Sequence, residues 1–197
     1  MTTDPIEPDT KDWTWVLQRP CPECGFDAAR LAVADLPMVL RDNAMAWVQR
    51  LSDPQPDQPV TRRPEPTTWS SLEYACHVRD VHRIFDERVA MMLGEDDPHF
   101  PNWDQDVAAV EHGYAGQHPG VVATELVEAA GAIAGRYAAV RDDQWQRCGV
   151  RSNGSEFTID SISRYHAHDV VHHAHDVGLD VVPLDDPMEG FLPKGPR

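Results

Sequence analysis

Residues 165–176 read YHAHDVVHHAHD and contain five of the ten histidines of this 197-residue chain. A helix repeats about every 3.6 residues, so His168 and His172 lie one turn apart on one face. At this spacing two imidazoles can bind one metal ion. The segment therefore predicts a helix that carries part of a metal site.

Apolar side chains recur with helical period in four segments of the chain. Two of these helices have clear beginnings, because Ser70 and Glu73 form a capping box and Thr158 is a good N-cap. The expected helices span residues 35–51, 70–93, 118–142 and 158–178. Four amphipathic helices of this length predict an all-α fold, a four-helix bundle.

The connections complete this prediction. A long crossover begins after Gly94, and Asn153-Gly154 predicts a small β-hairpin just before the last helix. We expect one bundle domain over residues 27–178. It is preceded by an N-terminal extension, residues 1–26, which holds the sequence CPEC, and followed by a proline-rich C-terminal tail, residues 179–197.

The composition excludes several classes of partner. The formal net charge is −16, which opposes binding to a phosphate backbone or to an anionic membrane surface. The sequence has no signal peptide pattern and no apolar run of the roughly 18 residues that a membrane span needs. We therefore expect a cytoplasmic protein that binds neither nucleic acid nor membrane.

His77 lies on the second predicted helix, on a face with Val81 and Ile84. A single histidine on an apolar stripe is usually a hydrogen-bonded core residue, but two helices with inward imidazoles favour a shared metal. Three histidines, His77, His168 and His172, would leave a fourth position open, as in a catalytic zinc site. Asp80, Asp169 and Asp176 are candidate acceptors for the ring N–H groups that do not bind metal.

The residues W69-S-x6-H77-V-R-D80 and Y165-x2-H168-D-x2-H172-H-x2-D176 resemble the DinB-like (YfiT-like) metalloprotein superfamily. The resemblance spans about residues 35–176 and implies a four-helix bundle with zinc or nickel at His77, His168 and His172. Members include bacillithiol- and mycothiol-dependent S-transferases and a mycothiol-dependent maleylpyruvate isomerase, and many are dimers.

The resemblance therefore implies a metal-dependent S-transferase or isomerase whose partners are a small-molecule thiol, such as mycothiol, and an electrophilic substrate. A metal that binds the thiol would lower its pKa and hold a thiolate ready for attack. Trp69, Trp103 and Asp104 are candidate pocket residues, and the sequence assigns no catalytic residue. A homodimer is also expected from the resemblance.

Two other functions stay open. The first is a metal-dependent hydrolase, because a metal that activates a thiol also activates water, and His168-Asp-x-x-His172 has the metal spacing of a zinc protease helix. The second is a metal-stabilised bundle that binds a ligand or partner without chemistry.

The pair Cys21 and Cys24 has three interpretations. A structural zinc would need two further ligands, and the sequence has no second C-x-x-C. A redox pair has this spacing but lacks the expected βαβ context. The third interpretation is that both thiols are simply packed.

Overall fold

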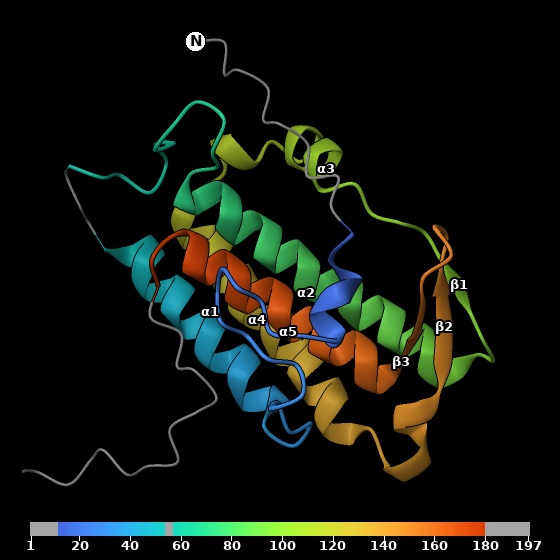
Figure 1. The fold of residues 1–197 in the computed structure, drawn as a ribbon. Coiled ribbons are helices and arrows are strands. Elements are labelled where there is room, and N and C mark those ends of the chain that lie inside the picture. The colour runs from blue at the N-terminus through green and yellow to red at the C-terminus, as the bar shows by residue number, and fades with distance from the viewer. Residues whose placement is uncertain (1–11, 54–56, 180–197) are drawn as a thin grey trace, which may run out of the picture.

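A computed structural model describes residues 12–53 and 57–179 of the chain. Four long helices dominate it: α1 (Leu36–Ser52), α2 (Ser71–Gly94), α4 (Pro119–Ala139) and α5 (Ile159–Asp176). Shorter helices are α3 (Gln105–Glu111) and the 3-10 turns η1 (Trp13–Leu17), η2 (Tyr114–Gly116) and η3 (Asp142–Gln146). The prediction of an all-α four-helix bundle is confirmed (Figure 1).

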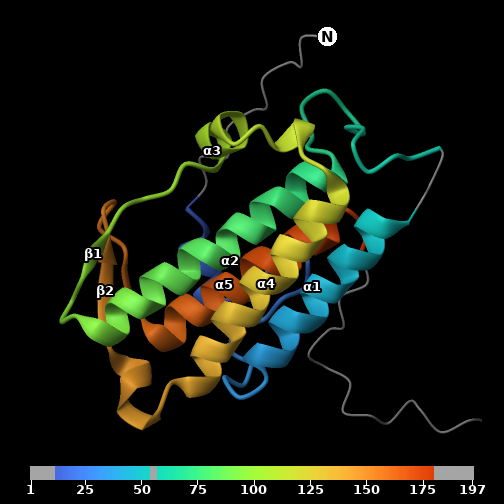
Figure 2. The same cartoon turned by 180° about the vertical axis from the view of Figure 1, so that it is seen from behind.

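The bundle has an alternating arrangement. Helices α1 and α2 each pack against both α4 and α5, so α1 and α2 are diagonal neighbours (Figures 1 and 2). The core between them is filled by large side chains with no more than 1% exposure, including Trp47, Leu126, Ile133 and Ile162. None of the described helices is long and apolar enough to cross a membrane.

The helix ends carry clear local signals, and the predicted capping box and the predicted Thr158 cap are both present. Ser70 and Glu73 form both hydrogen bonds of the capping box at α2, and His118 with Pro119 begins α4. Thr158 caps α5, and Gly178 follows its end with φ +69°. The long crossover between α2 and α4 contains α3 and η2.

The predicted hairpin is present at Asn153-Gly154, where β2 (Cys148–Arg151) pairs antiparallel with β3 (Glu156–Thr158). The sequence did not predict the third strand, β1 (His99–Phe100), which pairs parallel with β2 at one end of the bundle. Of the predicted terminal regions, residues 1–11 and 180–197 lie outside the described part of the chain.

A small residue is needed where this sheet meets α2. A Cβ at Gly149 would lie 2.8 Å from Phe100 Cε1 and 2.9 Å from Met92 Cγ, and both of these side chains are buried. We therefore expect Gly149→Ala to lower the free energy of unfolding by about 1–3 kcal/mol through overpacking.

The matched control is Gly131→Ala on α4, where a Cβ meets nothing within 4 Å. This change should raise the free energy of unfolding by up to about 1 kcal/mol, because alanine is the better helix former. Urea denaturation of both variants tests the pair, and equal stability of Gly149→Ala and the natural protein would contradict the packing argument.

Candidate metal centre

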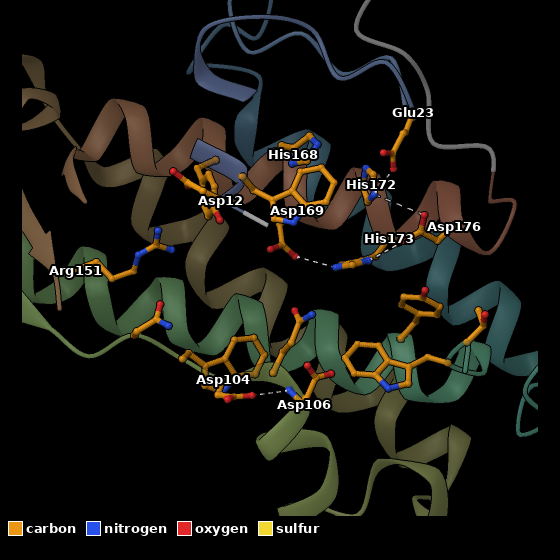
Figure 3. A pocket seen from close by; sticks show the side chains of 18 of the residues that line it. Asp12, Glu23, Asp104, Asp106, Arg151, His168, Asp169, His172, His173 and Asp176 are labelled. Carbon is orange, nitrogen blue, oxygen red and sulfur yellow. Dashed lines mark hydrogen bonds and ion pairs between the residues drawn. The ribbon is translucent and has the colours of Figure 1, made fainter. Parts of the chain in front are cut away.

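A cavity of about 630 Å³ opens between α5, the start of α2, the crossover and the N-terminal segment (Figure 3). Its lining is acidic, and apart from histidines Arg151 is the one basic side chain among its described lining residues. Trp69, Trp103 and Asp104, the predicted pocket residues, all line it. The acidic lining residues are Asp12, Glu23, Asp104, Asp106, Asp169 and Asp176.

At the wall of this cavity His77 of α2 meets Asp169 and His173 of α5. One ligand atom from each of the three residues lies within 4.8 Å of the other two. His77 Nε2 is 3.5 Å from Asp169 Oδ1, and His173 Nε2 is 3.7 Å from the same oxygen. Two imidazoles and one carboxylate thus converge on one point, which is the donor set of many open divalent metal sites.

The polar atoms of this group fit a cation. His77 is 1% exposed, and neither of its ring nitrogens has a hydrogen-bond partner among the described residues. Asp169 Oδ1 also lacks one, because its contacts to the two histidines do not have hydrogen-bond geometry. A buried polar atom without a partner costs about 1–3 kcal/mol, and one metal ion would give a partner to His77 Nε2 and Asp169 Oδ1.

The protonation states also suit a metal. Burial lowers the pKa of His77, with a smaller contribution from the nearby His173. Burial by itself would raise the pKa of Asp169, but the contacts with His77 and His173 lower it below its usual range. A neutral imidazole and an ionised carboxylate are the forms that bind metal.

Neighbouring side chains hold the two imidazoles in place. The His77 ring stacks on Trp103 at 5.2 Å with an interplanar angle of 16°, and Trp69 lies 5.3 Å away on another side. His173 Nδ1 donates to Asp176 Oδ2 at 3.0 Å, which leaves Nε2 directed at the site (Figure 3). Asp169 and His173 line the cavity, so three protein ligands leave coordination positions open toward it.

The structure separates the three histidines that the sequence grouped. His168 and His172 lie together, but their ligand atoms are close to those of Cys21 and Cys24. The ligand atoms of His77 are close to those of Asp169 and His173. The reason is rotation: successive residues of a helix are about 100° apart, and positions 169 and 173, not 168 and 172, face α2. The geometry therefore groups His77 with Asp169 and His173 instead of with His168 and His172, and binding of one ion by the three predicted histidines stays a prediction.

The predicted carboxylate partners of the histidines also differ in role. Asp80 accepts hydrogen bonds from Arg79 and Tyr114 and makes none to His77. Asp169 is a candidate ligand itself, and Asp176 contacts both His172 and His173. Sequence reasoning missed Asp169 and His173 as candidate ligands, although their spacing of four residues is the same as that of His168 and His172.

The other histidines of α5 have separate environments. His166 is fully buried and faces the core, where its Nε2 lies 3.0 Å from His82 Nδ1 and its Nδ1 lies 3.3 Å from the Tyr137 hydroxyl. His175 is exposed. Neither residue belongs to a group of described side chains that could hold a metal.

Comparison with known proteins agrees with this architecture. Among solved structures, the fold is similar to YfiT from Bacillus subtilis, which is described as a probable metal-dependent hydrolase with an unusual four-helix bundle topology. The two share 17% sequence identity with a TM-score of 0.64, over 73% of this chain and 82% of YfiT. No curated protein sequence matches the chain. Residues 39–177 match the family described as the DinB superfamily, and the chain belongs to that superfamily.

Proposed function

We propose that this protein is a metal-dependent enzyme that holds a divalent ion, zinc or nickel, at His77, Asp169 and His173. The observation that supports this most is that three ligand atoms, on buried or half-buried residues, converge at the wall of a large cavity. The ring nitrogens of His77 and Asp169 Oδ1 have no hydrogen-bond partner among the described residues. An ion bound there would act as a Lewis acid and lower the pKa of a thiol or water at its open position.

The lining of the cavity favours one class of substrate. Its carboxylates repel anionic ligands but accept hydrogen bonds from hydroxyl groups, and the indoles of Trp69 and Trp103 add apolar surface to the lining. These features suit a neutral, polyhydroxylated thiol such as mycothiol better than an anionic one such as bacillithiol. We therefore propose a thiol S-transferase or isomerase.

In this proposal the residues of the chain bind the metal ion and orient the thiol in the cavity. Asp169 and His173 hold the reacting end of the cavity, while Asp104 and Asp106 lie on its opposite side (Figure 3). The carboxylate of Asp104 is fixed because it accepts hydrogen bonds from the Asp106 and Val107 amides at the start of α3. The start of α3 thus forms a wall of the cavity against which the thiol can be positioned.

A metal-dependent hydrolase is the second candidate. It is favoured by the likeness to YfiT and by the several carboxylates near the site, which could accept a proton from an attacking water. The third function, a metal-stabilised bundle that binds a ligand or partner without catalysing a reaction, is compatible with the same metal-binding residues.

One experiment separates these functions. The metal-loaded protein is incubated with mycothiol and an electrophile such as monobromobimane, and separately with ester and amide substrates without thiol. We expect thiol conjugation above the uncatalysed rate, lowered at least about 100-fold by His173→Ala, since even loss of a ligand's hydrogen-bond partner costs about 10–100-fold.

The matched control is His175→Ala, which removes an exposed histidine two residues away and should leave the rate unchanged. Turnover of esters or amides without thiol would replace the transferase with the hydrolase. Absence of turnover in both assays, with metal bound, would contradict both enzymes.

A further inference from the structure

We propose that Cys21, Cys24, His168 and His172 form a second metal site, a closed structural zinc site that fastens the N-terminal segment to α5. One ligand atom from each of these four residues lies within 4.8 Å of the others. Three of the residues are buried, with exposed fractions of 1% for Cys21, 3% for His168 and 7% for His172. The argument for this site does not rest on the proposed activity.

The spacing of the ligands is that of known structural zinc sites. Such sites combine C-x2-C with H-x3-H, and here Cys21-x2-Cys24 meets His168-x3-His172. The cysteine pair lies on a tight turn in which the Gly25 amide donates to the Cys21 carbonyl at 2.9 Å and the Cys21 amide donates to the Phe26 carbonyl at 2.8 Å. Gly25 has φ +74°, a conformation that favours glycine.

The polar atoms of the group point to a ligand between them. His168 Nε2 is buried and has no hydrogen-bond partner among the described residues. Cys21 Sγ lies 3.7 Å from His172 Nδ1, a distance close to that between two ligands of one tetrahedral ion. His172 Nε2 lies 3.4 Å from Glu23 Oε2 and 3.7 Å from Asp176 Oδ1, so carboxylates can accept its N–H and leave Nδ1 for the metal.

Aromatic rings cover the site. The Trp13 ring lies 5.6 Å from the His168 ring and 5.0 Å from the His172 ring, and Phe26 lies 5.7 Å from His168. Two thiolates and two neutral imidazoles balance the charge of Zn²⁺, and soft thiolate ligands select zinc over harder ions. Because four protein ligands leave no open position, the role is structural.

The site has a consequence for the cavity. On α5, His168 and His172 face the N-terminal segment, whereas Asp169 and His173, each one residue later, face α2. An ion on the first pair therefore fixes the rotation of α5 that presents the second pair to His77. The carboxylate of Asp176 contacts both His172 and His173 and so connects the two groups (Figure 3).

The test counts and identifies the ions in the purified full-length protein. Elemental mass spectrometry should find two equivalents of metal in the natural protein and one in Cys24→Ser. Cys148→Ser, which removes an exposed thiol on β2, is the matched control and should keep both. His173→Ala should lose only the cavity ion. When the remaining ion of this variant is exchanged for cobalt, the thiolates of Cys21 and Cys24 should give thiolate-to-cobalt charge-transfer absorption.

A measurement on the natural protein guards against variants that fail to fold. Zinc K-edge X-ray absorption should show a sulfur shell at about 2.3 Å in addition to nitrogen and oxygen at about 2.0–2.2 Å. Absence of that sulfur shell, unchanged metal content in Cys24→Ser, or a Cys21–Cys24 disulfide in the isolated protein would each overturn the proposal. Failure of the cavity site alone would leave the sulfur-ligated ion in place, so the two sites are tested separately.

Discussion

Replacing His77 with phenylalanine should remove the cavity metal and the activity while leaving the metal-free protein at least as stable as before. Phenylalanine keeps a flat ring between Trp69 and Trp103 but offers no ligand atom. The change also removes two buried nitrogens that have no hydrogen-bond partner among the described residues. Each such atom costs about 1–3 kcal/mol, which exceeds the value of about 1 kcal/mol or less of the lost 3.5 Å contact with the partly exposed Asp169. The free energy of unfolding of the metal-free variant should therefore rise by about 1 kcal/mol or more.

The measurement pairs metal titration with chemical denaturation in the presence of a chelator. Metal affinity should fall by more than about 100-fold. Mutating a residue that only hydrogen-bonds to a metal ligand already lowers affinity by about 10–100-fold, and His77 is a ligand in this proposal. His175→Phe, at an exposed position of α5, should change neither quantity. A His77→Phe protein that binds the cavity metal normally, or that is less stable without metal, would show that His77 is an ordinary core residue.

Asp80→Ala should lower the free energy of unfolding by about 3 kcal/mol, a large loss for one substitution. Asp80 and Arg79 are 6% and 4% exposed, and the Arg79 guanidinium donates to both carboxylate oxygens of Asp80, at 2.8 and 3.1 Å. Tyr114 donates its hydroxyl to the same carboxylate at 2.7 Å. Without Asp80 the buried Arg79 guanidinium keeps only its bonds through Nη1 to Gln117 and to the partly exposed Glu125. Breaking a buried pair typically costs about 3–5 kcal/mol, and these remaining bonds place the expected loss at the lower end of that range.

The control is Asp86→Ala, which breaks the more exposed pair with Arg136 on α4 and should cost about 1 kcal/mol or less. Burial would raise the pKa of Asp80, but Arg79 and Tyr114 lower it below its usual value of 3.8. The stability from Asp80 is therefore present above pH 3.8 and is lost as the pH falls below that value. Urea denaturation measures both effects, and equal losses in the two variants would contradict this account.

The fold could be predicted because its signals are local. Ser70 with Glu73, Thr158 and the Asn153-Gly154 turn each specify the structure of the few residues around them. The strand β1 could not be predicted, because a two-residue parallel pairing depends on where the crossover meets the hairpin and has no sequence pattern of its own.

The two proposed metal sites were predictable as a region but not as sets of candidate ligands. In α5 the same spacing of four residues occurs twice, at His168 and His172 and one residue later at Asp169 and His173. Which pair faces α2 depends on the rotation of the helix, and that is set by packing against α2 and against the N-terminal segment. The proposed partners of the C-x-x-C pair likewise lie far away in sequence, 151 residues in the case of Cys21 and His172, so only the tertiary fold brings them together.

The most direct test of the cavity site is anomalous diffraction from crystals of the metal-loaded protein, recorded at the absorption edge of the bound metal. We predict an anomalous peak bounded by His77 Nε2, Asp169 and His173 Nε2, with at least one coordination position facing the cavity. A peak bounded by His77, His168 and His172, or no peak at the cavity wall, would contradict the assignment.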